Sequence, residues 1–133
     1  MANAVSKDIA TLLAANGFGT LGIDIFFGEW GKDSTDEQIL ILDTGGIDTV
    51  DKDQYEQPAF QVLQRGGKQK SVSVVYDAAR LIDIFLKEQL PLVTINGTDY
   101  LGFDPVSTPT GIGRDENDRY VYTMNYVTFR NPD

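Results

Sequence analysis

The fold is decided by the stretch SVSVVYDAARLIDIFLKEQ, residues Ser71–Gln89. Its apolar residues recur at intervals of three and four, which places them on one face of an α-helix; they are Val75, Ala78, Ala79, Ile82, Phe85 and Leu86. Ser71 or Ser73 can cap the start of this helix. Pro91 prevents the helix from continuing beyond Leu90. We therefore predict a long amphipathic helix whose apolar face packs on the rest of the domain.

Extended segments lie on both sides of this helix. Each is rich in β-branched or aromatic residues and is bounded by glycine, proline or polar turns. A strong hairpin signal, Asn96-Gly97, joins two of them. The predicted strands are Pro58–Arg65, Leu92–Ile95, Tyr100–Val106 and Arg119–Arg130.

The N-terminal half begins with a second predicted helix, from Ala4 to Asn16, which Gly17 ends. Ile23–Phe27 and Ile39–Leu42 are predicted strands, and we expect a hairpin to join them. The second of these strands is continuously apolar, as in a strand covered on both faces. Polar, glycine-rich composition predicts a long mobile loop over Asp43–Gln57 and a turn over Gly111–Asp118.

The elements therefore follow the order helix, three strands, helix, three strands. This order predicts an α+β fold with two helices packed on a mainly antiparallel β-sheet. The chain of 133 residues is long enough for one hydrophobic core and contains no repeat or interdomain linker. We expect a single domain over residues 1–133.

Composition removes many kinds of catalytic chemistry, because the chain contains no histidine and no cysteine. Nucleophile–histidine pairs, Cys/His zinc sites and the usual haem and iron–sulfur ligation all require one of these residues. We therefore expect no enzyme activity, no cofactor and no metal. The acidic run Asp115–Asp118 lacks the spacing of a calcium-binding EF-hand loop and is predicted to be a solvated turn.

One catalytic alternative stays open, because glycoside hydrolysis needs only a pair of carboxylates. Asp24 and Asp43 lie near the ends of two predicted strands and are the pair to test first. A structure in which no cleft holds two carboxylates within about 10 Å of each other would exclude this alternative.

The formal net charge is −9, from 20 acidic and 11 basic residues. This balance favours solubility and disfavours tight binding to nucleic acid, which requires neutralisation of phosphates. It also suits a protein past which a polyanion must slide without sticking. No stretch approaches the length of a membrane span, and the N-terminal apolar run has helical spacing rather than that of a secretion signal.

Interface candidates lie in the predicted loops Gly28–Glu37 and Asp43–Gln57. Others, Arg65, Lys68 and Lys70, form a basic cluster just ahead of the long helix. Trp30 is either a residue at the edge of the core or an exposed interface anchor. The basic cluster is either a solvated turn or a contact with an acidic patch on a neighbouring copy. The aromatic face of the last strand, which includes Tyr120, Tyr122 and Tyr126, is expected to serve packing or a subunit contact rather than base stacking. The candidates are Trp30, Ile47, Val50, Tyr55, Arg65, Lys68 and Lys70.

Three segments together resemble the tail terminator and minor capsid (tail completion) families of siphophages. They are ILILDTGG (Ile39–Gly46), PAFQVLQR leading into DAARLIDIFL (Pro58–Arg65 and Asp77–Leu86), and GIGRDENDRYVYTMNYVTFR (Gly111–Arg130). The resemblance covers most of the chain in order, although each motif alone is unspecific. The resemblance assigns no catalytic or other functional role to any individual residue of this chain.

The resemblance implies a structural virion protein at the head-proximal end of the tail, assembled in the host cytoplasm. Such proteins form a homohexameric ring that stops growth of the tail tube and joins the tail to the head connector. The implied partners are other copies of the chain, the tail tube protein and the head connector, while DNA passes through the ring without specific binding. A head-side connector, completion or minor capsid protein is the alternative.

Overall fold

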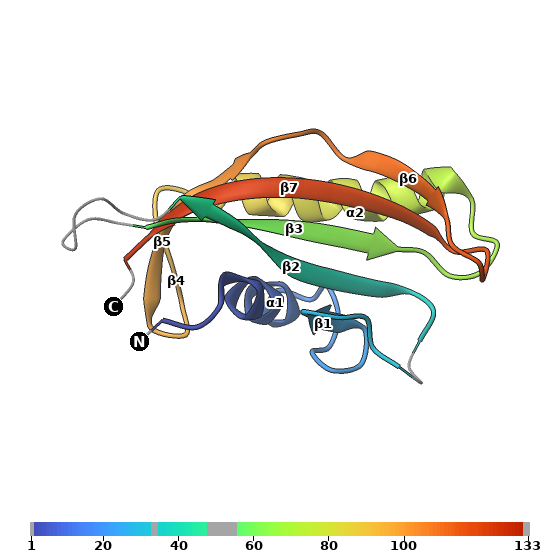
Figure 1. Cartoon of the computed structure of the whole chain (residues 1–133), viewed down its shortest axis with the longest axis horizontal. Helices are drawn as coiled ribbons and strands as arrows, with labels where there is room; N and C mark the ends of the chain where they lie inside the picture. The colour runs from blue at the N-terminus through green and yellow to red at the C-terminus, as the bar shows by residue number, and fades with distance from the viewer. Residues whose placement is uncertain (1, 33–34, 48–55, 132–133) are drawn as a thin grey trace.

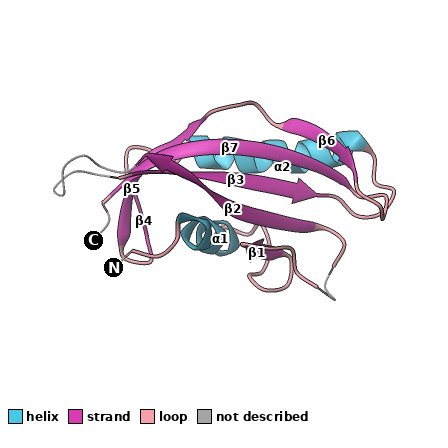
Figure 2. Cartoon of the chain, viewed as in Figure 1, coloured by secondary structure: helices cyan, strands magenta, loops and turns pink. Residues whose placement is uncertain are grey.

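The computed structural model describes residues 2–32, 35–47 and 56–131, which form an α+β fold (Figure 1 and Figure 2). The α+β class is therefore confirmed. Its elements, in chain order, are α1 (Val5–Ala15), β1 (Ile25–Phe27), β2 (Gln38–Ile47), β3 (Gln57–Arg65), α2 (Val72–Lys87), β4 (Val93–Ile95), β5 (Thr98–Pro105), β6 (Thr110–Arg114) and β7 (Tyr120–Arg130).

The strands form one mixed sheet in the order β1-β2-β3-β7-β5-β4, with β6 also paired to β7. The β1–β2 pairing is parallel, and the other pairings between described strands are antiparallel. Both β5 and β6 pair with β7, β6 with residues 120–123 and β5 with residues 126–130. As Figure 1 shows, β2, β3 and β7 are the long central strands.

Both helices pack on one face of this sheet. Ile41, Val62 and Met124 lie opposite one another on β2, β3 and β7, and all three are fully buried. Because directly opposed residues point to the same face, they define the face that meets the helices. The same core cluster contains Leu13 from α1 and Leu86 from α2.

A buried carboxylate also ties each helix to the sheet. In α1, Asp8 is fully buried and accepts a 2.5 Å hydrogen bond from the Tyr100 hydroxyl on β5. In α2, Asp83 is fully buried and accepts one of 2.5 Å from the Tyr126 hydroxyl on β7. Lys87 Nζ lies 2.7 Å from Asp83 Oδ2 and forms an ion pair with this buried carboxylate.

The predicted hairpin between the first two strands is wrong. The strand β1 runs parallel to β2, with Ile25 opposite Ile39. Ile23, which was expected to begin this strand, lies outside it and is exposed. A polar connection of about ten residues permits either arrangement, so local composition did not specify the strand direction.

Two predicted loops contain strand structure. Within the expected mobile loop Asp43–Gln57, residues 43–47 continue β2, and a bulge at Asp43 and Gly45 keeps them paired with β3. Residues 48–55 of that loop lie outside the described residues, whereas Glu56 bridges to Arg130 and Gln57 begins β3. Within the expected turn Gly111–Asp118, residues 111–114 belong to β6. Pairing with a neighbouring strand outweighs the low strand propensity of glycine at both sites.

The other predicted elements are confirmed with boundaries shifted by a few residues. Ser71 caps α2, its hydroxyl accepting a hydrogen bond from the Val74 amide. Asn96 and Gly97 both have positive φ angles, as the tight hairpin between β4 and β5 requires. Ile39, Leu40 and Ile41 are all buried, so this part of β2 is covered on both faces.

Gly46 is the glycine for which we predict a large effect of substitution. Its φ angle is +110°, and an added Cβ would lie 2.2 Å from the carbonyl oxygen of Gln57. Gly45 has a similar φ of +94° but open space around its Cβ position. Gly45→Ala should therefore cost about 1–2 kcal/mol of backbone strain, and Gly46→Ala clearly more. Denaturant unfolding measures both variants, and equal losses would contradict the steric argument.

Candidate interface at the Trp30 loop

The loop from Gly28 to Glu37, which we call the Trp30 loop, connects β1 to β2, and its described residues are fixed to the sheet beside them. Trp30 is half-buried, and the guanidinium carbon of Arg65 lies 4.4 Å from the centre of its ring. Arg65 is the last residue of β3 and is only 5% exposed. Its Nε donates a 2.8 Å hydrogen bond to the carbonyl of Asp36. The Arg65 side chain thus holds the loop in two ways. It stacks on the Trp30 ring and donates a hydrogen bond to the backbone of the loop.

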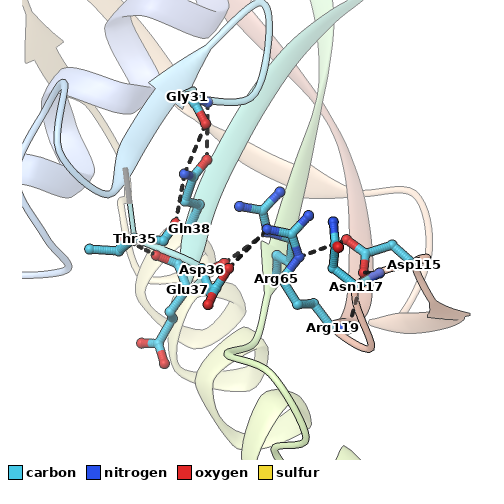
Figure 3. A network of polar contacts seen from close by, with 9 residues as sticks. All are labelled: Gly31, Thr35, Asp36, Glu37, Gln38, Arg65, Asp115, Asn117 and Arg119. Carbon is cyan, nitrogen blue, oxygen red and sulfur yellow. Dashed lines mark hydrogen bonds and ion pairs between the residues drawn. The ribbon is translucent and has the colours of Figure 1, made fainter. Parts of the chain in front are cut away.

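Gln38, the first residue of β2, holds the loop from its other side. Its side chain is buried, accepts a hydrogen bond from the Gly31 amide, and donates to the carbonyls of Gly31 and Thr35. Gln38 lies directly opposite Arg65 in the sheet. One cross-strand pair therefore anchors the loop (Figure 3).

Arg119, just before β7, joins this network to the turn between β6 and β7. It lies 3.1 Å from the Asp36 carboxylate and 2.8 Å from the Asp115 carboxylate. Asp115 also accepts hydrogen bonds from the amides of Asn117 and Arg119, which shapes the turn. Figure 3 shows the two arginines side by side between the loop and this turn.

A third segment, the turn between β3 and α2, is tied to the same end of the molecule. The Gln69 amide donates to the carbonyl of Asp118, and the guanidinium of Arg114 donates to the carbonyl of Lys70. The loop and the two turns therefore form one hydrogen-bonded end of the protein, which we call the Trp30 end.

The network around the Trp30 loop contains two cations, Arg65 and Arg119, and two carboxylates, Asp36 and Asp115. Burial and the neighbouring Arg119 lower the pKa of the Arg65 guanidinium, although the carboxylates of Asp115 and Asp36 oppose that change. Burial disfavours ionisation of Asp115, but its hydrogen bonds with Arg119 and Asn117 outweigh burial and lower its pKa. Arg119 contacts the carboxylates of Asp36 and Asp115, and Arg65 binds the Asp36 backbone, so the network links the loop to the turn.

The acidic run and the Asp24–Asp43 pair do not have the geometry of the sites for which they were considered. The described residues contain no group of three or more acidic side chains able to hold a metal ion, and the run Asp115–Asp118 forms the predicted turn. Asp24 binds the Thr20 amide, whereas Asp43 binds the amide and hydroxyl of Ser6. The β1–β2 register separates the two aspartates by about five residues along the strands, or about 16 Å. Glycosidase carboxylates lie about 5–10 Å apart, so this pair does not fit that chemistry.

The structure separates the proposed interface residues. Trp30 and Arg65 contact each other, with Arg65 buried, whereas Lys68 and Lys70 are exposed in the turn before α2. The backbone of Ile47 ends β2 at the opposite end of the sheet. Val50 and Tyr55 lie outside the described residues.

The aromatic face of β7 serves packing. Tyr126 is fully buried, and its ring stacks on Phe60 at 5.2 Å. Tyr122 lies between Tyr120 and Tyr76 of α2, with ring centres 5.3 and 5.5 Å away. Helix α2 therefore covers this face, as the packing interpretation required, rather than leaving a platform for bases.

Sequence reasoning missed the roles of Gln38, Asp36 and Arg119. A buried glutamine at the start of an apolar strand was the one available signal, because such a side chain needs partners. The partners themselves come from segments up to 83 residues apart, as in the contact between Asp36 and Arg119, and no local pattern identifies them.

Removing the Arg65 side chain should release the loop, and Trp30, the single tryptophan, reports the change. We expect Arg65→Ala to shift Trp30 fluorescence to longer wavelength and to increase its quenching by iodide, because the ring loses its stacked partner. Lys68→Ala, at an exposed site in the neighbouring turn, is the matched control. Unchanged emission in the Arg65 variant would show that the loop is held without it.

The chain is therefore a small α+β domain in which Gln38 and Arg65 hold a loop to one end of the sheet. The family model for bacteriophage tail terminator proteins matches residues 12–129. The chain therefore belongs to the bacteriophage tail terminator family and is a structural protein of the phage tail.

Comparison with solved structures supports the fold. Five solved chains match, and one aligns with a TM-score of 0.58 over 96% of this chain and 91% of its own length, at 10% identity. That structure carries no functional description, and at this identity it shows the fold alone. The comparison with curated proteins gives no match. No helix of the described residues is long and apolar enough to cross a membrane.

Proposed function

We propose that the chain assembles into a hexameric ring that caps the tail tube at its head-proximal end. The ring stops tube growth and then binds the head connector, and DNA passes through it without specific binding. Membership in the tail terminator family over residues 12–129 is the observation that carries this proposal. In this proposal the ring assembles in the host cytoplasm and stays in the virion.

The arrangement of the subunit supports two separate contacts along the tail axis. The Trp30 loop precedes β2, and Ile47 ends this strand at the other end of the sheet. Because β2 has ten residues, its two ends lie about 30 Å apart. A subunit with contact segments at opposite ends suits a position between two different neighbours, the tail tube and the head connector.

Tail length in phage that lack the protein tests this function. We expect electron micrographs of lysates from a nonsense mutant to show tubes of irregular, excessive length that do not join heads. Supply of the wild-type protein in trans should restore uniform length. Uniform free tails in the mutant would contradict termination and would favour the head-side connector role.

Direct observation of assembly tests the ring. Mass photometry and negative-stain images of the purified protein, alone and after addition of tubes from the mutant, should show closed rings of six copies. A protein that stays monomeric in both samples would overturn the proposal.

A further inference from the structure

The strand β6 is an open edge of the sheet. One side of β6 pairs with β7, and its other side has no strand partner among the described residues. Ile112 in this strand is 60% exposed. An exposed apolar side chain on an uncovered edge strand is available for contact with another chain.

The edge at β1, by contrast, is blocked by its own chain. The Gly22 amide donates to the carbonyl of Ile25, and the Ile25 amide donates to the carbonyl of Thr20. The turn before β1 therefore covers the outer side of that strand. Figure 1 shows β6 and β1 on opposite sides of the long central strands.

A groove lies on the other side of α2 from β6. It has a volume of about 270 Å³ and runs between α2, the turn after α1 and the first residues of β2. Phe18, Ala78 and Leu81 supply apolar walls, and Leu81 is 63% exposed. The two charged residues of its lining, Asp24 and Glu37, are both acidic.

The β6 side carries cations that complement this groove. Arg114 ends β6 and donates a 2.9 Å hydrogen bond to the carbonyl of Lys70, whose side chain is exposed. Asp118 pairs with Arg114 at 3.5 Å, and Glu116 is the other exposed acid of the adjoining turn. Lys70 forms no ion pair with another described residue, so its charge is available to a partner.

One subunit cannot bring these two surfaces together, because α2 lies between them. Ala78 and Leu81 of α2 line the groove, whereas Tyr76 of the same helix contacts Tyr122 near β6. A ring needs two different, mutually complementary surfaces on each subunit, joined head to tail. The groove offers apolar walls and two carboxylates, and the β6 edge offers the exposed Ile112 and the exposed cation of Lys70.

We infer that the acidic groove beside α2 receives the β6 edge of the next copy of this chain. Ile112 contacts Leu81 and Phe18 of the neighbour, and Lys70 and Arg114 face its Asp24 and Glu37. This inference rests on the proposed ring and assigns the surfaces that close it.

Single substitutions on each surface test the assignment. Leu81→Asp and Ile112→Asp each place a charge at an exposed position, so circular dichroism and thermal midpoints should stay close to wild type. Each variant should fail to form rings, both alone and on tube ends. Leu90→Asp is the matched control, because Leu90 is 65% exposed but lies outside both surfaces, and it should still form rings.

Mixing the two variants gives the sharper result. Leu81→Asp keeps an intact β6 edge, and Ile112→Asp keeps an intact groove. An equimolar mixture should therefore form heterodimers with one functional junction and nothing larger, as native mass spectrometry can show. Rings formed by either variant, or a mixture that stays monomeric, would overturn the assignment.

A charge exchange tests the polar part. Glu37→Lys and Lys70→Glu should each weaken assembly by at least tenfold, and the double variant should recover most of it. Failure of the double variant to recover would remove these charges from the interface. If all these variants form rings of the same size as wild type, this inference alone is refuted. If the wild-type protein forms no ring under any condition, the proposed function is refuted.

Discussion

Phe60→Ala is expected to lower the free energy of unfolding by about 3–5 kcal/mol. Phe60 is fully buried on β3, where its ring stacks on Tyr126 at 5.2 Å and meets Phe103 edge-on at 5.7 Å. Alanine would leave a cavity between three strands that backbone pairing prevents from collapsing. The loss is a large fraction of the roughly 5–15 kcal/mol of a typical domain.

Chemical denaturation with circular dichroism measures this loss. Phe129→Ala is the control, because Phe129 is 36% exposed near the end of β7, and it should cost much less. Losses of equal size in the two variants would show that the cluster around Phe60 is not the packing centre of the sheet.

Tyr100→Phe is expected to cost about 2–3 kcal/mol, although it removes a single oxygen atom. That hydroxyl donates to buried Asp8 and accepts a 3.1 Å hydrogen bond from Arg130. Phenylalanine would leave the Asp8 Oδ2 atom without this donor inside the protein. The Asp8 Oδ1 atom would keep the 2.8 Å hydrogen bond from Asn96, which limits the loss.

The Tyr100 hydroxyl also predicts how the free energy of unfolding depends on pH. Burial, with the adjacent Asp8, raises the pKa of Tyr100 above its usual value near 10. A raised pKa contributes stability that is complete below about pH 10 and is lost as pH rises toward the folded-state pKa. Wild-type stability should therefore fall in strong alkali more steeply than that of Tyr100→Phe.

Tyr120→Phe is the matched control for the hydroxyl, because the Tyr120 hydroxyl has no hydrogen-bond partner among the described residues. Its stability should stay within about 0.5 kcal/mol of wild type. An equally small change in Tyr100→Phe would show that water or Asn96 fully compensates Asp8.

The sequence correctly predicted those helices and strands that are specified by residues within the element itself. Helix α2 followed from its apolar stripe, Ser71 and Pro91, and the β4–β5 hairpin followed from Asn96-Gly97. The direction of β1 was not predictable, because three residues with an apolar pattern fit a parallel or an antiparallel neighbour equally well. Strand β6 was missed because Gly111 and Gly113 have low strand propensity, which pairing with β7 overrides.

The candidate site was predictable only in part. The basic and aromatic composition indicated Trp30, Arg65, Lys68 and Lys70 individually, but their grouping depends on which strands become neighbours. Arg65 was expected to end a strand as part of a solvated or partner-contacting basic cluster, and it does end β3, but its side chain is buried opposite Gln38. The buried aspartates were equally hidden, because Asp8 and Asp83 lie within helices of ordinary amphipathic appearance and receive their tyrosines from distant strands.

The spacing of contact segments along β2 has an evolutionary consequence. Substitutions about 30 Å apart with no shared partners affect stability almost independently. Mutations in the Trp30 end can therefore accumulate without disturbing the far end of the sheet, where Ile47 ends β2. Sequences of the family are therefore expected to vary at one end of the subunit independently of the other.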